Sequence, residues 1–130
     1  MAVPVPTASA AEIVSACRSL LAAVPDHLDD GVRRRPVTGD PTRTAAWGDP
    51  AITLRCGVAR ATTGIGPITI DTLSFLTTTV ESTTVWTTTD RAVNVSIDVP
   101  KSYREQVYDV TPLVSPIAKA LPAAGSAPGA

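Results

Sequence analysis

The sequence predicts a two-layer α+β domain: an N-terminal amphipathic helix packed on an antiparallel meander of four to five strands, followed by a short C-terminal helical segment. Three observations predict this class. Apolar residues recur with a helical period in residues 9–25, and they alternate with a period of two in two later segments. The chain of 130 residues also suits one compact domain.

The helix prediction depends on residues 9–25. Ser9 and Glu12 stand in capping-box spacing, and Pro25 ends the pattern because proline lacks a backbone N–H. The apolar residues between them fall on one continuous helical face. This face consists of Ile13, Ala16, Cys17, Leu20, Leu21 and Val24.

The strand predictions come from alternating patterns. In "AITLRCGV" and "VNVSIDV", apolar residues alternate with polar residues or glycine, which indicates half-buried strands. The segment between them is rich in Thr, Val and Ile, with turns expected near 71–72, 81–82 and 90–91. A two-residue turn at 71–72 would pair Ile70 with Leu73 and Ile68 with Phe75 on one face.

After the last strand, the segment "PKSYREQVYDVTPLVSPIAKALP" predicts one or two short helical pieces. Pro112 and Pro116 are tolerated well only near helix starts. We therefore expect no long terminal helix.

The two ends of the chain differ from its middle. Residues 1–8 are interpreted as a linker or lead, 9–121 as a single globular domain, and 122–130, which are small and rich in Pro and Gly, as a disordered tail. The opening lacks the basic and long apolar regions of a signal peptide, and no apolar run is long enough to span a membrane. We expect the native protein to have an N-terminal membrane anchor that is absent from this chain.

The composition limits the classes of partner. Apolar residues make up 44% of the chain but aromatic residues only 4%, so the core should be thin and aliphatic. Eleven basic and twelve acidic residues nearly balance, so the broad positive field that attracts nucleic acid is missing. We expect no nucleic-acid partner and no cofactor.

Cys17 and Cys56 lie on the predicted buried faces of the helix and of the first clear strand. We interpret them as a disulfide between the two layers, which would contribute roughly 4 kcal/mol through loop closure and would indicate an oxidising compartment. Two unreactive buried thiols are one alternative, and a catalytic or metal-binding role is another. His27 is the only histidine, so the chain lacks the four Cys or His ligands that a structural zinc usually needs, and we expect no metal site.

The stretch "AAWGDPAITLRCGV" resembles the actinobacterial domain-of-unknown-function family 3515, together with "RRPV" at 34–37 and Val99-Pro100 before Tyr103. An early Cys17 with Leu20 and Leu21, and Asp109 with Thr111 near the end, extend the resemblance over roughly residues 13–121. The resemblance implies an extracytoplasmic location, either associated with the cell membrane or secreted, behind an N-terminal signal or anchor. It implies no particular activity.

Six residues are candidate contacts for a ligand or partner: Trp47, Asp49, Arg55, Arg34, Arg35 and Tyr103. Arg55 comes first among them, because it alternates away from the core. The basic run at 33–35 could bind a phosphate or an anionic lipid head group, but Asp26, Asp29 and Asp30 could neutralise it, so we interpret it as a solvated or salt-bridged loop. Asp49 is suited to closing a turn at Gly48.

One modification motif is present. Asn94-Val95-Ser96 matches the N-glycosylation pattern, although so short a match arises often by chance.

Two functions from different classes fit the sequence. The first is a non-catalytic module of the cell envelope that is tethered to the membrane and binds a protein, a wall component or a lipid. The alternative is an envelope enzyme with a site near Asp49, Arg55 and Tyr103. A deep pocket that gathers these three residues would favour the enzyme. A shallow surface with Arg55 packed along the sheet, together with an apolar or charged patch beyond it, would favour the module.

Overall fold

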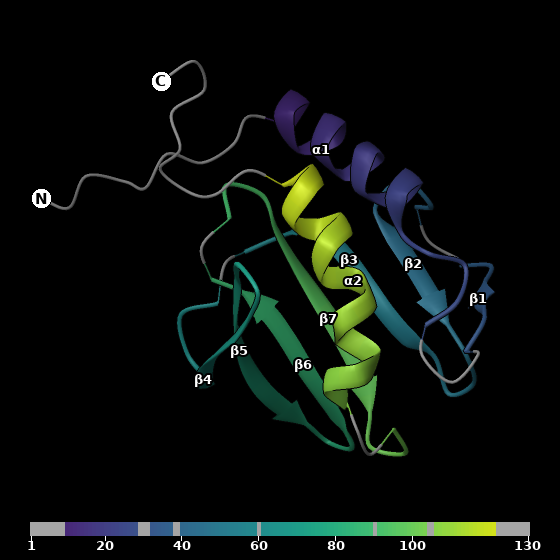
Figure 1. Cartoon of the computed structure of the whole chain (residues 1–130), viewed down its shortest axis with the longest axis vertical. Coiled ribbons are helices and arrows are strands. Elements are labelled where there is room, and N and C mark those ends of the chain that lie inside the picture. The colour runs from purple at the N-terminus through teal and green to yellow at the C-terminus, as the bar shows by residue number, and fades with distance from the viewer. Residues whose placement is uncertain are drawn as a thin grey trace, which may run out of the picture.

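The computed structural model has two layers, a seven-stranded antiparallel sheet and two helices that lie together over one face of it (Figure 1). It describes residues 10–28, 32–37, 40–59, 61–89, 91–103 and 106–121. The predicted α+β class is confirmed, and so is the N-terminal helix. The predicted lead at 1–8, Ser9 of the capping box and the predicted tail at 122–130 lie outside the described residues.

The sheet has the strand order β1-β2-β3-β7-β6-β5-β4. The first three strands form one meander, and the last four form a second meander that returns from the far edge, so that β7 pairs with β3. The strands are β1 (Arg34–Arg35), β2 (Thr44–Trp47), β3 (Ile52–Val58), β4 (Ile65–Ile70), β5 (Leu73–Val80), β6 (Thr83–Thr88) and β7 (Asn94–Pro100).

The prediction of a single meander with four to five strands is therefore wrong in strand number and in connectivity. Strands β1 and β2 contain two and four residues, which is too short to produce a readable alternation. The pairing of β3 with β7 joins segments about forty residues apart, and local patterns carry no information about such a pairing.

Alternation in β3 and β7 divides the sheet into two faces. Leu54 pairs with Ile97 on the buried face, and both are fully buried under the helices. Thr53 pairs with Asp98 on the opposite face. We call that opposite face, on which neither helix packs, the open face; it also carries Arg35, Ala46, Arg55 and Ser96.

Helix α1 (Ala10–Ala23) buries the predicted apolar face. Cys17, Leu20, Leu21 and the following Val24 are buried, and Ile13 and Ala16 are partly buried against the same core. The helix ends two residues before Pro25, as expected from the lost backbone donor.

Two of the predicted turns are confirmed. The turn at 71–72 pairs Ile70 with Leu73 and Ile68 with Phe75, in the predicted register. A second turn at 81–82 joins β5 to β6. Asp71 and Glu81 adopt positive φ angles of 54° and 56°, which tight hairpin turns require. Of the third expected turn, Asp90 lies outside the described residues.

The expectation of short terminal pieces is wrong, because α2 (Gln106–Ala120) is one helix of fifteen residues with Pro112 and Pro116 inside it. Each internal proline costs about 3 kcal/mol. The helix and the residue after it bury five apolar side chains, each worth roughly 1.5–3 kcal/mol, so burial outweighs the lost hydrogen bonds. These five are Val110, Leu113, Val114, Ile117 and Leu121.

Candidate functional site

The two cysteines are joined. Cys17 of α1 and Cys56 of β3 form a disulfide across 39 positions of sequence, which connects the helical layer to the sheet. A disulfide sulfur is neither a thiolate nucleophile nor a metal ligand, so the catalytic and metal-binding alternatives for these residues are excluded in this state. In the described part of the chain, no three His, Cys, Asp or Glu residues cluster in a way that could hold a metal ion.

Trp47 belongs to the core. Its side chain is fully buried at the end of β2, and its indole Nε1 donates a hydrogen bond to the backbone oxygen of Pro25 at 2.9 Å. This bond satisfies the polar atom that burial would otherwise leave without a partner. Trp47 therefore holds the segment after α1 against the sheet, and its burial places it away from any surface contact.

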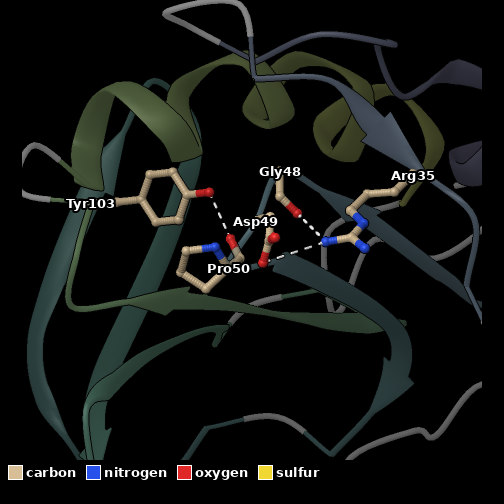
Figure 2. A network of polar contacts seen from close by, with 5 residues as sticks. All are labelled: Arg35, Gly48, Asp49, Pro50 and Tyr103. Carbon is tan, nitrogen blue, oxygen red and sulfur yellow. Dashed lines mark hydrogen bonds and ion pairs between the residues drawn. The ribbon is translucent and has the colours of Figure 1, made fainter.

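The turn after Trp47 is held from two sides (Figure 2). On one side, Arg35 Nη1 donates to the backbone oxygen of Gly48 at 2.8 Å and lies 3.8 Å from Asp49 Oδ1. On the other side, the Tyr103 hydroxyl donates to the backbone oxygen of Pro50 at 2.6 Å. Asp49 is 92% exposed, so its ion pair with Arg35 contributes little to stability.

Gly48 allows these groups to approach closely. Its φ angle is +78°, a conformation that other residues adopt at a cost, and a Cβ atom there would overlap with the Tyr103 hydroxyl. Asp49 thus belongs to a tight turn that launches β3, as the sequence predicts for Gly48-Asp49-Pro50, and Tyr103 contacts this turn from the segment after β7.

The basic run is an edge strand and not the expected loop. The backbone N–H of Arg34 donates to the backbone oxygen of Asp26, and Arg33 forms a β-bridge with His27. The acidic partner of Arg35 is Asp49, while Asp29 and Asp30 lie outside the described residues. Pairing with β2 places the half-buried Arg34 opposite Trp47 and the exposed Arg35 on the open face, opposite Ala46.

Arg55 projects from the middle of β3 on the open face and is 59% exposed. Its Nη2 lies 3.1 Å from Oδ2 of Asp98 on β7, whose side chain is only 18% exposed. Burial raises the pKa of Asp98, and the positive charge of Arg55 partly opposes this rise. Asp98 occupies a polar position of the predicted strand "VNVSIDV". It is absent from the candidate contacts, because its place beside Arg55 depends on the pairing of β3 with β7, which was not predicted.

A hollow of about 510 Å³ lies beside Arg55 on the open face. We call it the two-arginine hollow, because Arg35 from β1 and Arg55 from β3 both line it. Between them, small residues of β2 and β3 leave room where larger side chains would fill the space. The full lining consists of Arg35, Pro36, Val37, Thr44, Ala46, Ala51, Thr53 and Arg55.

The structure brings together Arg35 and Arg55 but does not gather Asp49, Arg55 and Tyr103 around one cavity. Neither Asp49 nor Tyr103 lines the two-arginine hollow. The hydroxyl of Tyr103 is held by the backbone of Pro50.

The glycosylation motif lies in a buried strand. Asn94 is buried; its Nδ2 donates to the backbone oxygen of Arg91 at 2.8 Å, and its Oδ1 accepts from the Thr88 hydroxyl at 2.8 Å. Because the amide is buried and bonded on both sides, the folded domain does not present Asn94 as a glycan acceptor.

Fold and site together define a small disulfide-linked domain in which two helices cover one face of an antiparallel sheet and the other face carries the two-arginine hollow. A family model described as "Protein of unknown function (DUF3515)" matches residues 1–125, and the chain belongs to this family. No curated protein and no solved structure matches the chain. Within the residues described, no helix has both the length and the apolar character needed to cross a membrane.

Proposed function

We propose that this chain is an extracytoplasmic, membrane-tethered, non-catalytic domain of the cell envelope that binds a protein, wall or lipid component through the two-arginine hollow. The disulfide between Cys17 and Cys56 is the observation that carries this proposal. Disulfides form and persist in oxidising compartments and are rare in the cytosol. The matching family model is described only as a protein of unknown function and names neither an activity nor a location.

The open face supports binding over catalysis. A concave surface lined by two arginines is suited to holding a charged group, whereas acid–base chemistry needs a positioned proton donor or acceptor facing the substrate. The envelope-enzyme alternative has less support, because Asp49 and Tyr103 do not line the hollow that contains Arg55.

The redox state of the cysteines in living cells tests the location. We expect Cys17 and Cys56 to resist a thiol-alkylating reagent after acid quenching of cells that produce the anchored protein, and to react after reduction. The same chain produced in a reducing cytosol is the control, in which both thiols should be alkylated. Two free thiols in the native cell would overturn the proposed location.

Site-specific crosslinking tests the binding role. A photoreactive amino acid at Pro36, which is exposed and lines the hollow, should capture a specific envelope component. The matched control places the same group at Ser15, which is exposed on α1. Equal capture from both positions, or none from Pro36, would contradict binding at the hollow.

A further inference from the structure

We propose that the two-arginine hollow binds the free carboxylate of a peptide whose last residues carry small aliphatic side chains. This inference rests on the proposed function, and it specifies the chemical class of the ligand. It depends on the arginine donors, on the aliphatic part of the lining, and on the charge of the surrounding face.

Each arginine is oriented by a contact that uses only one of its nitrogens. Arg35 contacts Gly48 and Asp49 through Nη1, and Arg55 contacts Asp98 through Nη2. A guanidinium has five N–H donors in a planar fork, so further donors remain on each side chain. A carboxylate accepts two parallel hydrogen bonds from such a fork, which a neutral amide end of a peptide cannot do.

The rest of the lining fits the body of a short peptide. Pro36, Val37, Ala46 and Ala51 present aliphatic carbon atoms that can contact small side chains of the ligand. Thr44 and Thr53 carry hydroxyls that can pair with its amide groups. An inorganic anion would use the arginines but would leave the aliphatic surface without a partner. The lining includes no aromatic ring on which a sugar could stack.

The charge of the open face disfavours a lipid surface as the ligand. On its described strands, the charged side chains are Arg35, Arg55 and Asp98, and Asp98 is paired with Arg55. Anionic membranes recruit clusters of four to eight basic residues, which this face does not have. Two arginines in one hollow match a single carboxylate better than an extended array of phosphates.

Titration of the isotope-labelled chain with N-acetyl-Ala-Ala, followed by NMR, tests the proposal. Because the hollow is open and the ligand small, the dissociation constant should be roughly millimolar. Amide signals of Thr44, Ala46 and Thr53 should shift, whereas the same peptide with an amidated C-terminus should cause no such shifts. Replacing either arginine, by Arg35→Gln or Arg55→Gln, should weaken binding about tenfold.

Two further variants make the test specific. Arg55→Lys keeps the charge but loses the fork, so it should also bind more weakly. Arg18→Gln removes an exposed arginine from α1, away from the open face, and should bind like the unmodified chain. Equal shifts with the amidated peptide, no binding of N-acetyl-Ala-Ala, or binding only of inorganic phosphate or of phosphatidylglycerol vesicles would overturn the proposal.

Crosslinking from Pro36 in cells separates this inference from the proposed function. If the unmodified anchored protein captures an envelope component and the Arg35→Gln/Arg55→Gln variant captures the same component equally well, the domain is a binding module but the carboxylate site is wrong. If the unmodified protein captures nothing specific, the proposed function itself fails.

Discussion

Arg55 and Asp98 form an ion pair on the open face, and the two side chains differ in their exposure to water. Arg55 keeps most of its contact with water, whereas Asp98 is largely removed from it. For Asp98 the loss of hydration is the larger influence, so its ionised form is less favourable in the folded chain than in the unfolded one. The pair therefore orients Arg55 more than it stabilises the fold.

This balance predicts how acid affects stability. A carboxyl with a raised pKa in the folded state holds its proton more tightly there than in the unfolded chain. Its contribution to the free energy of unfolding is therefore most favourable below pH 3.8, the ordinary pKa, and it declines as the pH rises through the raised pKa. Asp98→Asn should remove this decline and should be as stable as the unmodified chain, or more stable by up to about 1 kcal/mol, at neutral pH. Urea denaturation of both proteins across a pH series measures the difference, and parallel pH profiles would contradict the expectation.

The pKa of Asp40 is shifted in the opposite direction to that of Asp98. The hydroxyl and the backbone N–H of Thr42 both donate to Asp40 Oδ1, at 2.6 and 2.9 Å, and these bonds lower the pKa of its carboxyl. Its contribution is present above the ordinary value of 3.8 and is lost as the pH falls through the lowered pKa. Asp40 is present in both the unmodified chain and Asp98→Asn, so it changes the free energy of unfolding of both proteins equally at each pH. The difference between the two proteins along one pH series therefore reports on Asp98.

At the scale of elements, α2 is held in place by tertiary contacts and not by its own helix propensity. Arg91, which sequence analysis did not select, is buried and donates to the backbone oxygens of Leu121 and Thr72 at 3.1 and 2.9 Å. These bonds connect the end of α2 to the turn between β4 and β5. A cation at a helix C-terminus also interacts favourably with the helix dipole.

Because packing tolerates an unfavourable residue in α2, replacing that residue should stabilise the domain. In Pro116→Ala the helix regains a backbone hydrogen bond, and alanine is favoured over proline in a helix interior by about 3 kcal/mol. Part of this gain is offset, because proline also lowers the conformational entropy of the unfolded chain and alanine does not. We expect a net gain of about 1–2 kcal/mol in the free energy of unfolding, measured by urea denaturation. Ser115→Ala, at an exposed position of the same helix, should change it by less than about 0.5 kcal/mol. A destabilised Pro116→Ala variant would show that the ring is needed for packing.

At the scale of the whole molecule, the disulfide is the covalent link between the two layers. Apart from it, α1 contacts the sheet through its narrow apolar face, and much of its packing is with α2. Among the described residues, the buried hydrophobic core is aliphatic apart from the disulfide, Trp47, Phe75 and Trp86. For a domain with so few large side chains, a cross-link between layers is a substantial part of the total stability.

Reduction should therefore weaken the domain measurably. Opening a loop closed across 39 positions should lower the free energy of unfolding by about 4 kcal/mol. Urea denaturation with and without dithiothreitol measures this loss. The Cys17→Ala/Cys56→Ala variant is the control and should not respond to the reductant. An unchanged midpoint for the reduced protein would show that the link contributes little.

The sequence determined the features that neighbours along the chain control. The helical period, the turn at 71–72 with its register, and the alternation in β3 were predicted and are confirmed. The strand β7 is also present, but Asn94 and Ser96 on its polar side are buried as well, so it is not the half-buried strand that the alternation indicated. The same local patterns placed Cys17 and Cys56 on facing layers and directed Arg55 away from the core.

Only the tertiary structure decided the features that depend on contacts between distant segments. The short strands β1 and β2 are defined by their pairing in the sheet, and β7 pairs with β3 across about forty residues of sequence. Helix α2 continues through two prolines because its apolar side chains are buried in the core. The candidate site belongs to this second group. Arg35 and Arg55 line the same hollow because their strands, β1 and β3, lie on either side of β2 in the sheet. This strand order results from pairing between distant segments, which a local sequence pattern does not predict.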